Sequence, residues 1–178
     1  MGLRLASAIW GLAEATLFFL VPDVLLSAIA LRDRGLALRC CVWALSGALA
    51  GGALMFLAAA GASDAAVTAV GHVPGVTGEM LTRVESGLDE LGSWAMFLGP
   101  LTGTPYKIYA VTSPAAGIEL WWFLLVSVPA RVIRFVVVAL MASFVSATVL
   151  RNLSYRRRLS LLLGFWAVFY TAYFTVLT

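Results

Sequence analysis

The stretch Leu5–Ala30, LASAIWGLAEATLFFLVPDVLLSAIA, is apolar along most of its length but contains Glu14 and the pair Pro22-Asp23. A charged side chain at the centre of a membrane helix costs about 2.5–3.5 kcal/mol on the insertion scale. Proline removes a helix donor and clashes with the preceding turn, and broken backbone at membrane depth is tolerated only where protein or a watery cavity covers it. We therefore expect residues 5–30 to form a re-entrant helical hairpin, and a kinked helix that crosses once is the alternative.

The composition of the chain is that of a membrane protein. Its 178 residues are 62% hydrophobic and 12% charged, whereas soluble domains carry about 25% charged residues, and its mean hydropathy is +0.97. We expect an all-α protein that forms a single polytopic membrane domain over residues 1–178. The net charge of +3 is too small and too scattered for a nucleic-acid-binding protein. Glu14 also argues against a cleaved signal peptide, because it interrupts the apolar core that such a peptide needs.

Four more apolar segments follow the first. They cover residues 40–61, 93–118, 120–149 and 159–177. All but 93–118 read as transmembrane helices, at about 20 residues per crossing. The segment 93–118 is instead interrupted by glycine and proline, so we expect it to form a second re-entrant hairpin. The residues expected to shape the two hairpins are Pro22, Gly99, Pro100, Pro105 and Tyr106.

Basic residues in the loops indicate the topology. Arginines gather in loops 31–39 and 151–158, whereas the stretch 62–92 is mostly acidic, and positive loops favour the cytoplasm. Both arginine loops and Arg4 fall on one side of the membrane only if both broken segments are re-entrant. We therefore expect a multi-pass protein with its N-terminus in the cytoplasm and its C-terminus outside.

This order of elements reads as an inverted repeat, the plan of many transporters. A hairpin and a helix are followed by a second hairpin and helix from the opposite side, and then by one additional C-terminal transmembrane helix. Between the halves, residues 76–92 carry Met80, Val84, Leu88 and Leu91 near one helical face. We expect a short amphipathic helix here, either along the outer membrane surface or packed on the protein.

Two arginines lie deep in the segment 120–149. Arg131 and Arg134 are three residues apart and so share a helix face, and Arg131 lies roughly 17 Å into its segment at 1.5 Å per residue. That depth requires an anionic partner, and Glu14 and Asp23 are available if the first hairpin reaches the middle of the membrane. Either these groups form structural ion pairs, or they form a site for an anionic group or a coupling proton.

The candidate substrate- and ion-binding residues are the five ionisable residues of the apolar segments, Glu14, Asp23, Lys107, Arg131 and Arg134. Two acidic and three basic side chains sum to +1, which suits a phosphate or another anion, because the arginine fork matches phosphate oxygens. Glu14, once removed from water, could bind a proton during transport. Asp23 directly after Pro22 could instead cap the second half-helix of the hairpin.

Catalytic chemistry finds little support in the sequence. Cys40 and Cys41 are adjacent and His72 is the only histidine, so neither a disulfide framework nor a Cys/His metal site is expected. The sequence offers no usable histidine-based nucleophile system and no paired intramembrane aspartates, which argues against an intramembrane enzyme. We expect no catalytic residues, no metal and no cofactor.

Three motifs follow one another along the chain. They are WGLAEAT running to VPDVLL at 10–26, TPYK at 104–107 and ARVIRF at 130–135. In this order and spacing they resemble the signatures of the DedA/VTT family, also called SNARE-associated Golgi proteins, in its bacterial YqaA-like branch. The chain departs from that pattern at Ala130, where the family usually has glycine, and at Pro114, an extra proline after the TPYK motif.

The resemblance implies two facing re-entrant hairpins that move lipids across the inner membrane of a bacterium. By motif position, Glu14 and Asp23 match the acidic residues thought essential in the family, and Lys107, Arg131 and Arg134 match its basic ones. We expect a proton-coupled transporter or flippase for a lipid phosphate of the undecaprenyl-phosphate or phospholipid type. Its partners would be membrane lipids, protons and further copies of itself. The alternative is a small-solute or ion carrier or channel that uses the same charged site.

Overall fold

The computed structural model describes residues 2–177, with the side chains at positions 98, 100–102, 176 and 177 outside the description. Within this part of the chain the fold is all-helical, as the composition predicts. In chain order the elements are α1 (Gly2–Ala15), α2 (Asp23–Ala30), α3 (Arg34–Gly61), α4 (Ser63–Gly71), α5 (Gly78–Leu91), the 3-10 turn η1 (Gly92–Trp94), α6 (Ala95–Thr102), α7 (Tyr106–Thr112), α8 (Leu120–Thr148) and α9 (Tyr155–Leu177).

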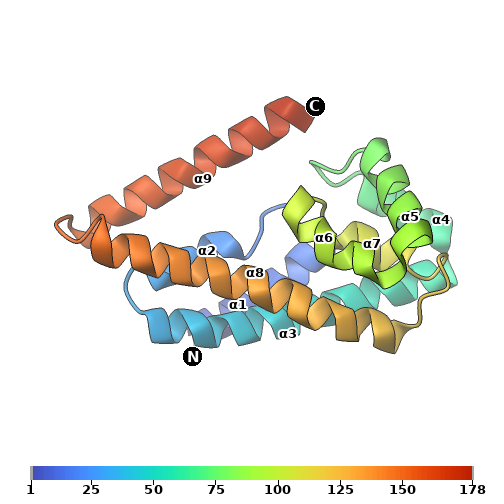
Figure 1. Cartoon of the computed structure of the whole chain (residues 1–178), viewed down its shortest axis with the longest axis horizontal. Helices are drawn as coiled ribbons and strands as arrows, with labels where there is room; N and C mark the ends of the chain where they lie inside the picture. Colours follow the sequence, from blue (N-terminus) through green and yellow to red (C-terminus); the bar gives the residue numbers. More distant parts are fainter. Residues whose placement is uncertain (1, 178) are drawn as a thin grey trace.

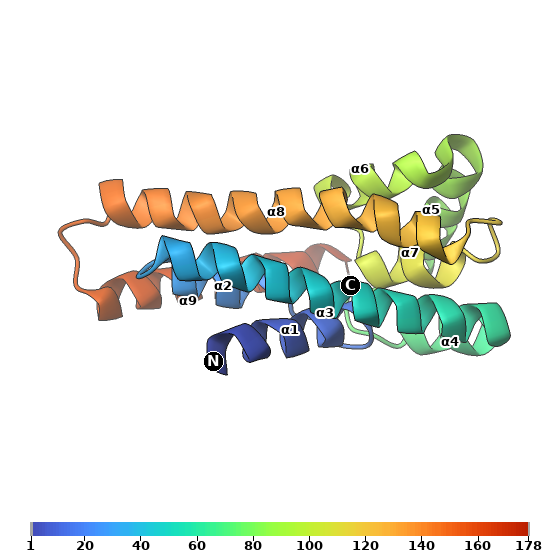
Figure 2. The same cartoon turned by 90° about the horizontal axis from the view of Figure 1, so that it is seen from below.

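Two long helices, α3 and α8, form the frame of the molecule. They lie side by side and run in opposite directions, with α1 packed along α3 (Figures 1 and 2). Both are long and apolar enough to cross a membrane, as expected for 40–61 and 120–149. The first begins earlier, at Arg34, because the Asp33 carboxylate accepts a hydrogen bond from a backbone N–H of its first turn. The third expected span, 159–177, lies in α9, which does not meet the same test over the described residues.

Both broken segments are interrupted in the structure. In the first, α1 ends at Ala15 and α2 begins at Asp23, directly after Pro22. In the second, α6 is terminated by Gly103, whose φ of +78° is a left-handed conformation that favours glycine, and α7 begins directly after Pro105. The two breaks expected from proline are therefore confirmed. The re-entrant course of each segment relative to a bilayer, and the inverted repeat, stay predictions.

Glycines allow α1 and α3 to approach closely. A Cβ added to Gly47 would lie 1.9 Å from the carbonyl oxygen of Ala8, and one added to Gly11 would lie 2.1 Å from that of Ala44. Neither position can accept a larger residue without moving backbone. Small residues therefore bring these two helices into contact within one chain.

The two arginine loops lie at the same end of the molecule. Ser146, near the end of α8, donates a hydrogen bond of 2.9 Å to the carbonyl of Leu31. The guanidinium of Arg32 lies 5.8 Å from the centroid of the Tyr155 ring, so the loop before α3 touches the start of α9. The acidic helices α4 and α5 lie at the other end of α8 (Figure 1). The two charge classes are thus separated along the long axis of the molecule.

The amphipathic helix expected over 76–92 is α5. It begins after Thr77, whose hydroxyl accepts a hydrogen bond from a backbone N–H of the first turn. Met80, Val84 and Leu88 are buried, and they share a core cluster with residues of α7. The sequence left two placements open for the apolar face of this helix, and in the structure that face packs on the protein. The preceding helix α4 is not predicted by the sequence analysis.

The last helix, α9, stands apart from α8 and returns along the molecule toward the end that holds α5 (Figure 1). It is attached mainly to the first broken segment. Trp166 donates a hydrogen bond of 3.1 Å from its ring nitrogen to the hydroxyl of Ser27, and the Tyr170 hydroxyl accepts one of 2.9 Å from the N–H of Val21. Aromatic side chains of α9 therefore cover the break between α1 and α2.

Candidate functional site

The carboxylate of Glu14 forms an ion pair with the guanidinium of Arg131. Glu14 lies in the last turn of α1, directly before the first break, and Arg131 lies in the middle of α8. They are 4% and 6% exposed. Both charges are therefore held away from solvent and neutralise each other, as the depth of Arg131 in its segment requires.

Asp23 and Arg134 form a second pair, one helical turn along α8. The Arg134 nitrogens Nη2 and Nε lie 2.6 and 2.8 Å from the same oxygen of Asp23, Oδ2. Asp23 is 1% exposed, whereas 35% of the Arg134 side chain is exposed. The capping role expected as an alternative for Asp23 is wrong. Asp23 is already the first helical residue, Pro22 occupies the cap position, and no side chain within the described part of the chain caps the start of α2.

Lys107 joins the two breaks. Its ammonium donates a hydrogen bond of 2.7 Å to the carbonyl oxygen of Phe18, in the connection between α1 and α2. The lysine lies in the first turn of α7, directly after the second break, and is 2% exposed. A carbonyl left without a helical partner thus receives a charged donor. The two interrupted segments meet through this contact.

Tyr106 supports Arg131 from the second broken segment. Its ring centroid lies 4.3 Å from the guanidinium carbon of Arg131, within the range of a cation–π contact. Its hydroxyl donates to the hydroxyl of Ser127 at 2.9 Å, and Ser127 donates to the carbonyl of Phe123 at 2.7 Å. Tyr106 was expected only to shape the hairpin, and the structure gives it a contact with the charged site.

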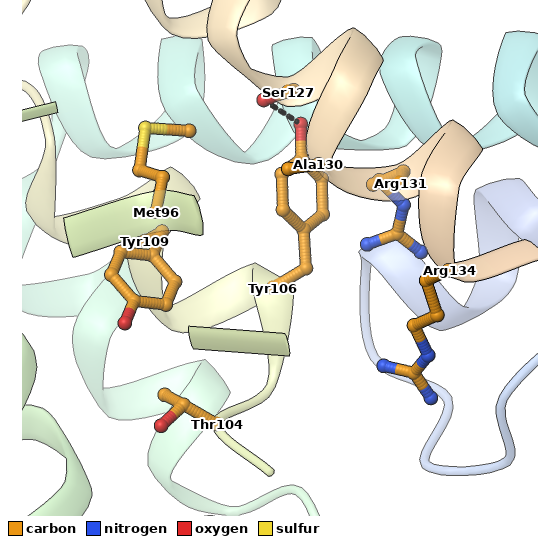
Figure 3. Close-up of a pocket in the computed structure, with 8 residues that line it drawn as sticks. All are labelled: Met96, Thr104, Tyr106, Tyr109, Ser127, Ala130, Arg131 and Arg134. Atoms are coloured by element: carbon orange, nitrogen blue, oxygen red, sulfur yellow. Dashed lines mark hydrogen bonds between the residues drawn. The ribbon is translucent and has the colours of Figure 1, made fainter. Parts of the chain in front are cut away.

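A small cavity lies beside these groups (Figure 3). Its volume is about 20 Å³, enough for about one water molecule. Figure 3 shows Arg131 and Arg134 extending from α8 on one side, toward the connection between α1 and α2. The residues that line the cavity come from α6, α7, α8 and the second break, and they are Met96, Thr104, Tyr106, Tyr109, Ser127, Ala130, Arg131 and Arg134.

The two ion pairs leave hydrogen-bonding capacity unused. Oδ1 of Asp23 and Nε of Arg131 are buried without a hydrogen-bond partner among the described residues. A buried polar atom without a partner costs about 1–3 kcal/mol, and more in a charged group. With two carboxylates against Arg131, Arg134 and Lys107, the cluster keeps a formal charge of +1. This arrangement can therefore accept a further anionic oxygen or a water molecule.

Gly99 lets α6 lie against α7. A Cβ added to Gly99 would lie 2.4 Å from Cε2 of Tyr109, so a larger residue would push the two helices apart. This close contact gives Gly99 a packing role between α6 and α7, and its role in shaping a re-entrant hairpin stays a prediction. Pro100, expected to share that role, lies within α6, and its side chain falls outside the described residues.

The structure brings together all five ionisable residues expected at the site: Glu14 with Arg131, Asp23 with Arg134, and Lys107 with the first break. Sequence reasoning missed Ser127 and Met96. Neither carries a signal in the sequence, because a serine or methionine in an apolar segment is ordinary. Among the described residues, no group of three His, Cys, Asp or Glu side chains could hold a metal ion.

The geometry of the site is that of a buried charge cluster at the junction of two interrupted helices and one long helix. Comparison with protein-family models, curated proteins and solved structures gives no match for this chain. The resemblance to DedA/VTT proteins therefore stays a prediction, and the function is argued from the site itself.

Proposed function

We propose that this protein is a membrane transporter, a flippase of DedA/VTT type, that moves a lipid phosphate across a bacterial inner membrane. One observation carries the proposal. Two ion pairs, Glu14–Arg131 and Asp23–Arg134, are held beside a water-sized cavity where two broken segments meet. Ionisable residues at membrane depth usually line a substrate or ion pathway, and substrate sites of transporters form between interrupted helices.

The positions of the two arginine loops support the expected topology. Two re-entrant hairpins require both arginine loops on one face, and the contacts Ser146–Leu31 and Arg32–Tyr155 hold those loops at one end. In this proposal α1–α2 and α6–α7 are the re-entrant hairpins, α3 and α8 are their partner spans, and α9 is the additional span. The arginine end faces the cytoplasm.

The charges suggest how a phosphate could enter the site. In the structure the carboxylates of Glu14 and Asp23 occupy the arginines, so a phosphate must displace a carboxylate. A proton taken up by Glu14 removes its negative charge and leaves Arg131 without an ionic partner. The arginine fork then binds phosphate oxygens. Protonation and anion binding thus favour each other, which is the basis of the proposed proton coupling.

Transport also needs the site to open alternately to the two faces. The Lys107–Phe18 hydrogen bond joins the two breaks, and a rocking motion of one half against the other would break it. The ammonium released from Phe18 would then add a third cation to the headgroup site. The lipid tail would remain in the bilayer throughout.

The proposal is tested with purified protein in liposomes that carry a fluorescent long-chain alkyl phosphate in one leaflet. We expect wild-type protein to accelerate leaflet exchange and a pH gradient to bias it. Glu14→Gln should abolish exchange, because an amide cannot take up and release a proton. The matched control is Glu79→Gln, which removes a carboxylate from an exposed pair with Arg83 and should exchange lipid like wild type.

Normal exchange by Glu14→Gln would contradict the site assignment. Absence of exchange above empty liposomes by folded wild-type protein would contradict lipid transport itself. In that case the flux of phosphate and small anions through the same liposomes tests the alternative, a small-solute or ion carrier or channel built on the same charges.

A further inference from the structure

The helix α9 is attached to the rest of the molecule along one narrow face. None of its described side chains is buried, whereas α3 and α8 each bury several, and it stands apart from α8 (Figure 1). Beyond residue 160, its partly buried side chains follow the spacing of one helical face, and they are Leu162, Trp166, Tyr170, Tyr173 and Phe174. An element with few buried apolar contacts opens at a lower cost in free energy than the core does.

Hydrogen bonds from aromatic side chains hold this face of α9 in place. Two of them reach Ser27 in α2 and Val21 in the first break, as described above. A third runs from the hydroxyl of Tyr173 to the carbonyl oxygen of Gly75, at 3.1 Å, in the loop between α4 and α5. Gly75 has a φ of +83°, and a Cβ added to it would lie 2.8 Å from Cε1 of Tyr173. The far end of α9 therefore rests on a position where only glycine fits.

The opposite end of α9 is fixed more firmly, through Arg158. The guanidinium of this residue donates hydrogen bonds of 2.9 and 2.8 Å to the carbonyl oxygens of Leu153 and Arg151, and one of 3.0 Å to the hydroxyl of Ser146 in α8. Hydrogen bonds from a charged donor are stronger than those between neutral groups. The turn between α8 and α9 is therefore an anchored end, whereas the rest of α9 is held by single neutral hydrogen bonds and ring contacts.

The first break depends on α9 for one of its backbone partners. Side chains from three elements satisfy backbone groups of the break. Trp10 of α1 donates a hydrogen bond of 3.0 Å to the carbonyl oxygen of Leu20, Lys107 of α7 binds a second carbonyl, and the Tyr170 hydroxyl of α9 accepts from the N–H of Val21. Interrupted backbone at membrane depth needs a partner from protein or water. When α9 moves away, the N–H of Val21 must be hydrated, so opening of α9 and entry of water at the break occur together.

Arg134 is the member of the charge cluster that reaches the surface. Its side chain is 35% exposed, whereas the other four ionisable residues of the site are buried. The positive charge of Arg134 acts on the hydroxyl groups of both Tyr170 and Tyr173, so both tyrosines lie within electrostatic reach of it. The face of α9 that covers the break thus also borders the exposed side chain through which the cluster is reached.

We propose that α9 is a movable gate for the buried charge cluster. It pivots at Arg158, and in the closed state it covers the first break and rests on Gly75. Release of the Tyr170–Val21 hydrogen bond opens the break and admits water and an anion to Arg134. The inference rests on the proposed function in one respect, that the cluster is the transport site, and it applies to any anion that the cluster binds.

The first test measures opening of α9 without transport. In a background with both native cysteines replaced by alanine, Ser27→Cys places a thiol beneath Trp166, at a position that is 2% exposed. Adding Tyr170→Phe removes the hydroxyl that accepts from Val21 and keeps the ring. We expect N-ethylmaleimide to modify the introduced thiol about three- to tenfold faster in this variant, in detergent, because the closed state loses one hydrogen bond.

Two controls separate opening of α9 from loosening of the whole protein. Thr171→Val removes a neighbouring hydroxyl that bonds within α9, to the carbonyl of Ala167, and it should leave the reaction rate at the parent value. The thiol of Cys40, which is 0% exposed in the core formed by α2, α3 and α8, is measured separately with Ser27 restored and only Cys41 replaced. It should react equally slowly with and without Tyr170→Phe. Equal rates for Tyr170→Phe and Thr171→Val, or a parallel rise at Cys40, would overturn the inference.

The second test locks α9 to the break during transport. The rings of Phe19 and Phe174 meet across this contact, with centroids 5.7 Å apart, so Phe19→Cys and Phe174→Cys in the cysteine-free background can be joined by a bifunctional thiosulfonate. We expect leaflet exchange of the fluorescent alkyl phosphate to fall by about tenfold or more when the two are linked, and to recover after reduction. Each single-cysteine variant treated with the same reagent is the control.

The two tests separate the gate from the proposed function. Exchange that continues at the unlinked rate in the linked protein would overturn the gate and leave lipid transport standing. A protein that exchanges no lipid before linking would contradict the proposed function, and the thiol reaction rates would still decide whether α9 opens.

Discussion

At the residue scale, the structure of the site depends on how its buried charges are paired. Removing one partner of a buried ion pair leaves an uncompensated charge and costs about 3–5 kcal/mol in soluble proteins. Movement of the first broken segment away from α8 would leave the charges of the Glu14–Arg131 and Asp23–Arg134 pairs uncompensated. A structural ion pair requires only a positive charge at positions 131 and 134, and lysine would supply one. Phosphate binding uses the arginine fork, so an arginine-to-lysine substitution distinguishes the two roles.

Arg131→Lys tests that distinction. Lysine keeps the positive charge and a partner for Glu14 but loses the stacking of the guanidinium on Tyr106, so the midpoint of thermal unfolding in detergent should fall only slightly below the wild-type value. Lysine lacks the planar fork, so affinity for a short-chain alkyl phosphate, measured by calorimetry, should fall by about tenfold. Arg83→Lys, at an exposed pair, is the control for both measurements. Unchanged affinity in Arg131→Lys would indicate that the pair is structural.

At the element scale, close packing of α1 on α3 positions Glu14. The carboxylate sits in the last turn of α1, and among the described residues no ion pair forms nearer the start of that helix. The placement of Glu14 therefore depends on glycines of α3 that allow the backbone of α1 to approach. The same logic applies to the second segment, where Gly99 admits the ring of Tyr109. Small residues thus set the distance between the elements that carry the charges.

Gly47→Ala should therefore destabilise the protein. The added Cβ would lie 1.9 Å from the carbonyl oxygen of Ala8, so α1 must shift, and overpacking of this kind costs about 1–3 kcal/mol. We expect a lower midpoint of thermal unfolding in detergent. Gly61→Ala is the control on the same helix, since its Cβ would meet nothing within 4 Å. Equal midpoints for the two variants would contradict the intrachain packing of α1 on α3.

At the scale of the whole molecule, charge is distributed along the long axis. The loops rich in arginine meet at one end of α8, and the acidic helices α4 and α5 lie at the other (Figures 1 and 2). A bilayer normal along this axis would leave the arginine end in the cytoplasm by the positive-inside rule. It would also leave the ion pairs between the two faces.

Cysteine accessibility in intact cells tests this topology. With Cys40 and Cys41 replaced by alanine, Asp33→Cys and Asn152→Cys should react only after the membrane is opened, because both positions lie in arginine loops. Glu85→Cys, on the exposed face of α5, should react with a membrane-impermeant maleimide from outside. Labelling of the two loop positions from opposite sides would exclude a pair of re-entrant hairpins.

The sequence by itself determined the helical class, the two long apolar helices, the two breaks and the identity of the charged residues. Each of these depends on local chemistry. Proline at 22 and 105 favours a break because it removes a helix donor, although Pro129 lies within α8 without ending it, and a charge in an apolar segment is unusual whatever surrounds it. The order of the three motifs likewise indicated five candidate site residues before any contact was known.

Only the tertiary structure decided which charges meet. The partners in the pairs Glu14–Arg131 and Asp23–Arg134 are 117 and 111 residues apart in the chain, and Lys107 reaches Phe18 across 89 residues. No local pattern encodes such contacts. The packed position of α5, the support of Arg131 by Tyr106 and the cavity beside the two arginines have the same origin. They arise where elements that are distant in sequence pack against one another. At such contacts the environment of a side chain depends on residues from the other elements.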